Sequence, residues 1–252
     1  MNWRGRKKVF KGILRFETKR MMRNFVPVFF ALVFPVMMLL IFGGIYGNKP
    51  STQFGGRGVV DSSVPAYLVL VVSVTGLMSF PLGLAEYRDR GVLKRFRSTP
   101  AKASSFLFAQ GVINLVLSLV GACLLVLVGF VIFGLHRPKQ IVLTVLVLLA
   151  VTVAMYSIGA VVAALARSER AATAAANLIY FPMIFLSGAT IPLAIFPSTM
   201  RTISDIIPAT YGVELLQHVW LGSATNIPLD CIVIFMTVVI CMLLSIRAFR
   251  WE

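Results

Sequence analysis

Six long apolar runs constrain this chain more than any other feature of its sequence. A helix needs about 20 consecutive apolar residues to cross the hydrocarbon core of a bilayer. Six segments reach that length, and we therefore expect an all-α polytopic membrane protein with six transmembrane helices. These spans run approximately over Phe25–Tyr46, Val64–Ala85, Phe106–Leu135, Gln140–Ala166, Ala171–Ile191 and Ile227–Ile246.

Composition supports the same fold class. Of 252 residues, 58% are hydrophobic and 13% are charged, and a soluble domain of this size cannot bury so much apolar surface in one core. The formal net charge is +15, which in a soluble protein would suggest a nucleic-acid partner. Here the basic residues lie between the apolar runs, so they indicate membrane topology and contact with anionic lipid headgroups, and no nucleic acid is expected as a partner.

The distribution of basic residues predicts the orientation in the membrane. If the N-terminus is inside, 19 of the 24 Lys and Arg residues fall in inside segments and five fall outside. Cytoplasmic loops carry an excess of Lys and Arg. We therefore expect a multi-pass protein of the bacterial inner (plasma) membrane with both termini in the cytoplasm.

The first 24 residues form an amphipathic pattern. Helical spacing places Trp3, Val9, Phe10, Ile13, Leu14, Phe16 and Met21 on one broad face and Arg4, Lys8, Lys11, Arg15 and Lys19 on the other. Such segregation is typical of a helix that lies in the membrane interface. We therefore divide the chain into an interfacial helix, residues 1–24, and a six-span domain, residues 25–252.

The sequence lacks the residues that ion-driven transport, ATP hydrolysis and proteolysis would need. Carriers driven by protons or sodium use ionisable groups near the bilayer midplane, and none of the six spans has one near its middle. The sequence also contains no phosphate-binding G-x-x-x-x-G-K-[ST] loop, no H-E-x-x-H motif and no G-x-S-x-G motif. We expect no catalytic residue, metal site or bound cofactor in this chain, and the energy for any active transport must come from another chain.

The connection between the second and third spans, residues 86–103, has the composition of a docking segment. It is strongly basic, and Gly91 and Pro100 mark the ends of a short predicted helix within it. Val92, Leu93 and Phe96 fall on one helical face and form an apolar knob, which is what docking into a partner's groove requires. Glu86 and the bases would orient this knob by ion pairs; the bases are Arg88, Arg90, Lys94, Arg95 and Arg97.

The region after the fifth span, residues 192–226, is repeatedly broken by proline. The stretches Pro197–Ile206 and Pro208–Leu221 each predict a short helix with Pro in its first turn. Both are too short to span a bilayer, so we expect them to re-enter the outer leaflet.

Both segments carry the motifs of a known family. The sequence EYRDRGVLKRFRSTPAKASSFLFAQ resembles the cytoplasmic signature of ATP-binding-cassette type-2 permeases. The outer region is similar to that family's SG turn, proline and P-x-x-Y-x-x-x-x-L element. Its matching residues are Ser187, Gly188, Pro192, Pro208, Tyr211 and Leu216.

The resemblance implies a permease with the G-type exporter fold, in which residues 86–103 form the coupling helix. It implies a second permease chain, identical or related, and two copies of a separate ATPase subunit that bind ATP and magnesium. Membrane lipids would surround the spans. An apolar path suits a hydrophobic or amphipathic substrate, such as a drug, an antibiotic or a lipid-like molecule.

Two alternatives stay open at this point. The same family includes permeases for polysaccharide or sodium export, which share the span pattern. A membrane protein of another class, with a role in assembly or immunity and no transport, would have no use for a coupling segment.

Overall fold

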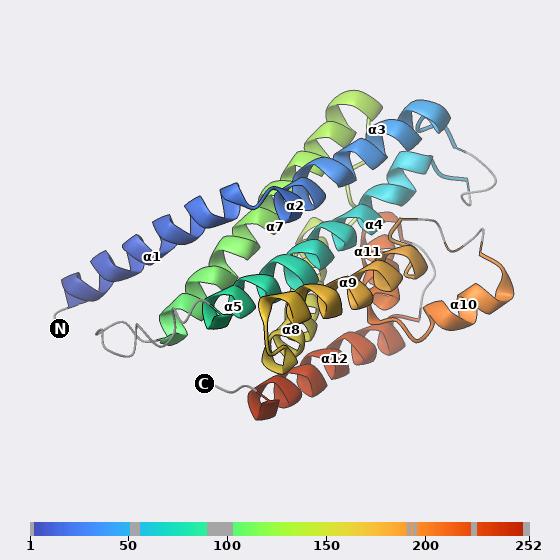
Figure 1. The fold of residues 1–252 in the computed structure, drawn as a ribbon. Coiled ribbons are helices and arrows are strands. Elements are labelled where there is room, and N and C mark those ends of the chain that lie inside the picture. Colours follow the sequence, from blue (N-terminus) through green and yellow to red (C-terminus); the bar gives the residue numbers. More distant parts are fainter. Residues whose placement is uncertain are drawn as a thin grey trace.

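The fold is a bundle of helices. A computed structural model describes residues 3–50, 56–89, 103–190, 193, 196–222 and 226–248, with side chains throughout these ranges except for residues 3–11, 13 and 103–107. No β-strand element occurs within these ranges. Figure 1 shows the start of the first helix and the end of the last helix at the same end of the bundle. We call this the α1 end, and the opposite end, where α11 finishes, the α11 end.

The helices follow the predicted apolar runs in order. They are α1 (Trp3–Arg23), α2 (Phe25–Val28), η1 (Phe29–Val33), α3 (Phe34–Tyr46), α4 (Val59–Ser73), η3 (Val74–Ser79), α5 (Phe80–Asp89), α7 (Ala103–Phe133), α8 (Ile141–Leu165), α9 (Glu169–Leu186), α10 (Ser198–Ser204), α11 (Pro208–Leu221) and α12 (Ile227–Ala248). The elements η1 and η3 are π-helical turns that continue the helices on either side of them.

Five of the helical stretches are long and apolar enough to cross a membrane. They are Phe25–Tyr46, Val59–Asp89, Phe108–Phe133, Ile141–Leu165 and Ile227–Ala248. The all-α polytopic fold is thereby confirmed. The remaining expected span corresponds to α9, an 18-residue helix that begins with Glu169 and Arg170, and it is not among the five. The count of six therefore stays a prediction.

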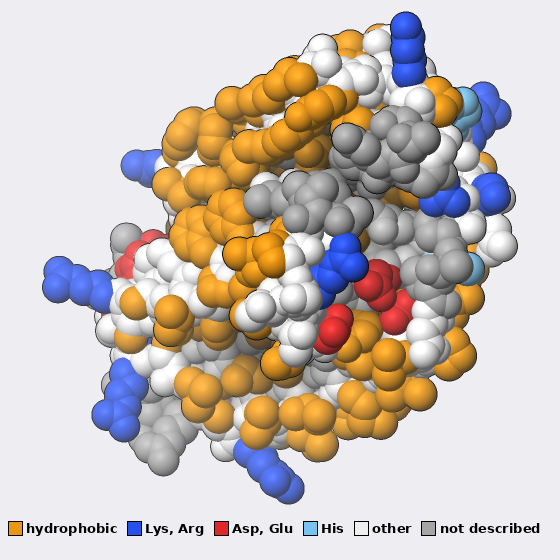
Figure 2. All heavy atoms as spheres, turned by 90° about the vertical axis from the view of Figure 1, so that its right-hand side faces the viewer, with side chains coloured by type: hydrophobic (Ala, Val, Ile, Leu, Met, Phe, Trp, Pro, Cys, Tyr) orange, Lys and Arg blue, Asp and Glu red, His pale blue; other side chains and the backbone are white. Residues whose placement is uncertain are grey.

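The second span lies at the centre of the bundle. In its most apolar part, 83% of the residues of Val59–Asp89 are buried, against 11% for Ile227–Ala248. Figure 2 shows apolar side chains around the periphery of the molecule. Exposed apolar side chains lie on α7, α8 and α12, and they include Leu127, Val142 and Phe235. These outer faces are suited to contact with lipid or with another chain.

A close crossing of small residues joins the middle of this central span to α8. A Cβ atom on Gly159 would collide with the carbonyl oxygen of Gly76, and a Cβ atom on Gly76 would lie 2.8 Å from the backbone carbon of Met155. Glycine at both positions lets the two backbones approach, as small residues do in membrane helix packing. A similar contact joins α7 to η1, where a Cβ atom on Gly121 would lie 2.6 Å from the oxygen of Ala31.

Two short helices occur after α9, in the stretches where the sequence predicts them. The stretch predicted at Pro208–Leu221 is α11, with Pro208 in its first turn, and the stretch at Pro197–Ile206 is the shorter α10. Gly212 of α11 faces Val151, near the middle of α8. The helix therefore runs from inside the bundle toward the α11 end, while its re-entry into a leaflet stays a prediction, as does the seating of α1 in the interface.

We predict that Gly159→Leu lowers the free energy of unfolding by on the order of 1–3 kcal/mol, because the new side chain has to displace backbone. Thermal unfolding of the purified protein in detergent, followed by circular dichroism, measures the effect. Gly44→Leu is the matched control, since a Cβ atom there meets nothing within 4 Å. Equal melting temperatures for the two variants would contradict the close crossing.

Candidate functional site

The predicted coupling residues begin in the last turn of α5. Glu86 and Arg88 belong to that turn, at the α1 end of the bundle. The other predicted coupling residues lie outside the described part of the chain; they are Arg90, Val92, Leu93, Lys94, Arg95, Phe96 and Arg97. The structure therefore describes only the first residues of the predicted coupling segment, at the end of α5.

Two charged residues of this turn bind the ends of two other helices. Nη1 of Arg88 donates hydrogen bonds to the carbonyl oxygens of Ala163 (3.1 Å) and Ala166 (2.7 Å) at the end of α8. The carboxylate of Asp89 accepts a hydrogen bond of 2.7 Å from the backbone amide of Glu169, at the start of α9. A cation at a helix C-terminus and an anion at an N-terminus both complement the helix dipole. The end of α5 is thus fixed to α8 and α9 together.

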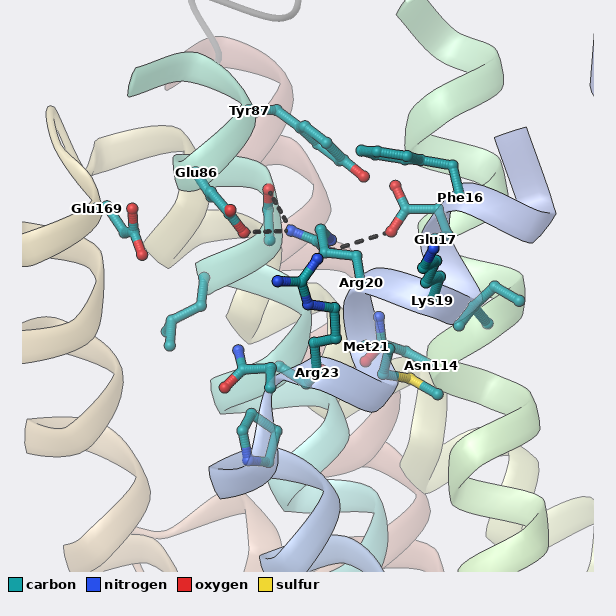
Figure 3. A pocket seen from close by; sticks show the side chains of 16 residues that line it. Phe16, Glu17, Lys19, Arg20, Met21, Arg23, Glu86, Tyr87, Asn114 and Glu169 are labelled. Carbon is teal, nitrogen blue, oxygen red and sulfur yellow. Dashed lines mark hydrogen bonds and ion pairs between the residues drawn. The ribbon is translucent and has the colours of Figure 1, made fainter. Parts of the chain in front are cut away.

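Glu86 connects the same turn to α1. Its carboxylate lies 2.7 Å from Nη1 of Arg20, and Nη2 of Arg20 lies 3.2 Å from Glu17, one turn earlier in α1 (Figure 3). The Arg20 guanidinium also lies 4.7 Å from the centre of the Tyr87 ring. A Cβ atom on Gly83 would collide with Arg20, so the absence of a side chain at this position allows the ion pair to form.

Glu17 is the member of this cluster that sequence reasoning missed. Its side chain is 1% exposed, and burial raises its pKa to about 7, although Arg20 lowers it in part. The available signal was that Glu17 is the one acid among the first 24 residues, three positions before Arg20. The amphipathic pattern of residues 1–24 depends on hydrophobicity alone and predicts no role for this pair.

A cavity of about 740 Å³ opens beside the cluster, between α1, α5 and α7. Glu17, Arg20 and Glu86 line it together with bases of α1 and apolar residues of all three elements. Glu169 of α9 also lines it. The charged residues at the α1 end therefore line an open cavity and are not packed into a closed core.

The predicted outer residues lie at the other end of the bundle, so the structure does not bring the two predicted sets into one site. Ser187 and Gly188 form the turn after α9, where Gly188 has φ +80°, a conformation that favours glycine. Leu216 is fully buried in the core. Pro192 lies outside the described residues.

Hydroxyl groups hold the turn after α9 against the start of α11. Oγ of Ser204 donates to the carbonyl oxygen of Leu186, and Oγ1 of Thr210 donates to that of Ser204 at 2.8 Å. Tyr211 OH donates to the carbonyl oxygen of Asp205 at 2.5 Å. The Pro208 and Tyr211 positions of the motif therefore serve to start and orient α11.

Hydrogen bonds between Asp61 and His136, which sequence reasoning also missed, join three elements at the α11 end. Asp61, near the start of α4, accepts a hydrogen bond from the backbone amide of His136 (2.9 Å), and its second carboxylate oxygen lies 2.8 Å from Nδ1 of His136. Nε1 of Trp220 donates to the carbonyl oxygen of His136, and Arg57 donates to that of Leu221. These contacts join α4, the turn between α7 and α8, and the end of α11.

The arrangement at the α1 end can transmit force, because one helical turn holds three other helices by charge and hydrogen bonds. Among the residues with described placement, no group of three or more His, Cys, Asp or Glu side chains is placed to hold a metal ion. What the geometry provides is one turn of α5 that is bonded to α1, α8 and α9 together.

We predict that Glu17→Gln stabilises the protein at pH 8 and leaves its stability nearly unchanged at pH 5. The folded protein holds the Glu17 proton up to about pH 7, whereas the unfolded chain releases it near its usual value, so this carboxyl lowers stability as the pH rises between the two. Melting temperatures of the purified protein at both pH values test this. Thr18→Val, on the exposed side of the same turn, should show no pH-dependent difference; a pH-independent effect of Glu17→Gln would refute the shifted titration.

Relatives of this chain are transport permeases. The putative transport permease ycf38 of Porphyra purpurea is 22% identical over 199 residues, which cover 77% of this chain and 68% of that protein. The probable doxorubicin resistance ABC transporter permease protein DrrC of Mycobacterium tuberculosis strain H37Rv is 21% identical over 214 residues, 83% of this chain and 76% of the relative. The probable multidrug ABC transporter permease YbhS of Escherichia coli K12 is 25% identical over 171 residues, or 68% of this chain, which spans under half (45%) of YbhS.

A family model describes the chain more completely than any of these relatives. The model of ABC-2 type transporters matches residues 8–221, from α1 through the end of α11. The matched region includes the α5 turn, the predicted coupling segment and the turn after α9. The resemblance of those segments to type-2 permeases is confirmed, and this multi-pass membrane protein belongs to the ABC-2 type transporter family.

Proposed function

We propose that this chain is the permease subunit of an exporter that moves a hydrophobic or amphipathic substrate across the membrane, powered by a separate ATPase subunit. The observation that carries the proposal is the α5 turn, where Glu86, Arg88 and Asp89 hold α1, α8 and α9. A push on the segment that follows this turn would move four helices together. Such a joint suits a chain that receives its energy through an interface.

The substrate class rests on different support. The printed names of two relatives refer to multidrug transport and doxorubicin resistance, and those properties belong to the relatives. In this chain, the central span is largely apolar, and the polar groups beside its middle are uncharged. Thr75 of this span bonds to Ser118 of α7 at 2.6 Å, and Ser118 bonds to Tyr156 of α8 at 3.2 Å. A path with few charges favours an apolar or amphipathic solute over a bare ion.

The assembly that we propose contains two permease chains, as a homodimer or a related heterodimer, and two ATPase subunits that bind ATP and magnesium. Val92, Leu93 and Phe96 would dock into the ATPase, and Arg88 would pass the movement to α8. The assembly would lie in the bacterial inner membrane, with the α1 end in the cytoplasm.

Orientation is tested by impermeant thiol labelling of intact cells, in a variant whose three native cysteines are replaced by alanine. We predict that Arg137→Cys, in the turn at the α11 end, reacts from outside. Arg167→Cys, an equally exposed position at the α1 end, should react only after permeabilisation. Labelling of Arg167→Cys in intact cells would invert the proposed topology.

Coupling is tested by co-purification of the ATPase and by substrate-stimulated hydrolysis. Phe96→Ala should weaken ATPase binding by about 30-fold or more, because truncation of a buried aromatic anchor typically costs on the order of 2 kcal/mol. Leu93→Asp should act in the same direction. Lys102→Ala, beyond Pro100, is the control and should bind the ATPase normally.

Arg88→Leu separates docking from transmission. Because Arg88 bonds within the permease, this variant should retain the ATPase and lose substrate stimulation. If all of these variants bind and stimulate the ATPase like the unmodified chain, the proposed coupling route is wrong. If the chain recovers no ATPase at all in its unmodified form, a role without transport is favoured instead.

A further inference from the structure

The cavity at the α1 end lies where a lipid headgroup would lie. The first candidate span begins at Phe25, directly after α1, and the second ends at Asp89. The cavity is bordered by Asn24, directly before the first span, and by Glu86, near the end of the second. Its walls toward the hydrocarbon are apolar, formed by Pro27, Leu82 and Ile113. A ligand in this space would therefore face polar groups at one end and lipid chains at the other.

Two buried acceptor atoms of the cavity lack donors among the described residues. Within that part of the chain, Oε1 of Glu17 and Oδ1 of Asn114 have no hydrogen-bond partner, and the two side chains are 1% and 3% exposed. The amide orientation of Asn114 is supported by the bond of 2.9 Å from its Nδ2 to the carbonyl oxygen of Gln110. A buried acceptor without a donor costs about 1–3 kcal/mol. Both residues line the cavity, so a ligand that satisfies them must bring N–H or O–H donors, and beside the Glu17 carboxyl a cation is favoured.

Two basic side chains of the same cavity also lack partners. Lys19 and Arg23 line it and are exposed, and neither forms an ion pair or hydrogen bond with any residue in the described ranges. Arg20, by contrast, is held between Glu17 and Glu86. In the close view of Figure 3, Arg23 reaches into the middle of the cavity. These two bases are placed to receive an anionic group.

The cavity calls for a ligand with three parts: a cation that can donate hydrogen bonds, an anionic group and apolar chains. A phospholipid with a primary amine has all three. We propose that the cavity between α1, α5 and α7 binds the headgroup of a primary-amine phospholipid, with its ammonium on Glu17 and Asn114 and its phosphate on Lys19 and Arg23. The acyl chains then leave along Pro27, Leu82 and Ile113. Burial is the main cause that raises the pKa of Glu17, and Arg20 pairs with one of its two carboxylate oxygens. A bound ammonium would donate to the other oxygen, Oε1.

Other common lipids satisfy only part of the site. A choline headgroup has a quaternary ammonium with no N–H to donate to Asn114. A glycerol headgroup brings a phosphate for Lys19 and Arg23 but no cation for Glu17. A soluble amine without phosphate leaves both bases unpaired. The inference depends only on the geometry of this chain, so it stands or falls independently of the proposed export.

The test uses the full chain, purified in detergent at pH 8 and stripped of lipid, with native mass spectrometry of added phosphatidylethanolamine, phosphatidylcholine and phosphatidylglycerol. We expect phosphatidylethanolamine to bind at least tenfold more tightly than phosphatidylcholine and to raise the melting temperature. Glu17→Gln should remove that preference, because a neutral amide cannot balance an ammonium charge. Arg23→Ala should weaken binding of both phosphatidylethanolamine and phosphatidylglycerol.

Arg15→Ala is the matched control, since Arg15 is an exposed base of α1 that does not line the cavity. If Glu17→Gln fails to purify as a folded protein, Asn114→Ala tests the same acceptor pair. Equal binding of the three lipids, tighter binding of phosphatidylglycerol, or the same lipid profile in Arg15→Ala and Arg23→Ala would each overturn the proposal. Neither an ATPase nor a transport assay enters the experiment.

Discussion

The carbonyl groups at the end of α8 need hydrogen-bond donors from outside that helix, and the structure of the α1 end depends on how this need is met. The last four carbonyls of a helix have no donor within that helix, and water is scarce near the hydrocarbon region. Arg88 supplies the donor from α5, and Asp89, its neighbour, supplies an acceptor for the first amide of α9. Because two helices depend on one turn of a third, the last turn of α5 cannot move without them.

The same solution recurs at the α11 end, with different residues. Arg57 donates to the carbonyl oxygen of Leu221 at the end of α11, and Asp61 holds the turn at His136. The central span, Val59–Asp89, is therefore fixed by charged or polar groups at both ends and by a glycine crossing at its middle. Side chains with full charges lie at the ends of this span, where their desolvation costs least, and the middle is held by packing.

The sequence predicted the parts of this fold that depend on local apolar pattern. The helix expected at Gln140–Ala166 runs over Ile141–Leu165, and the one expected at Pro208–Leu221 has those bounds. The second span begins five residues earlier than Val64, at Val59, because its polar first turn is compensated by a partner 75 residues away in the chain, the pair of Asp61 with His136. The pairing of Arg20 with Glu86, 66 residues away, was missed for the same reason. Pairing between distant segments leaves no periodic signal in either one. The predicted coupling segment and the region after the fifth span were recognisable by their resemblance to a family and not by periodicity.

The π-helical turns in the first two spans have a consequence for how their surfaces are oriented. Each α-helical residue advances the side-chain direction by about 100°, and a π turn inserts an extra residue into one turn of the helix. The residues after Val33 and after Ser79 are therefore rotated, relative to those before, away from where an uninterrupted helix would put them. One span thus presents two differently facing stripes, one on each side of its π turn. A shift of either π turn along its span would rotate by about 100° the side chains between its old and new positions, with no helix unfolding and no end released.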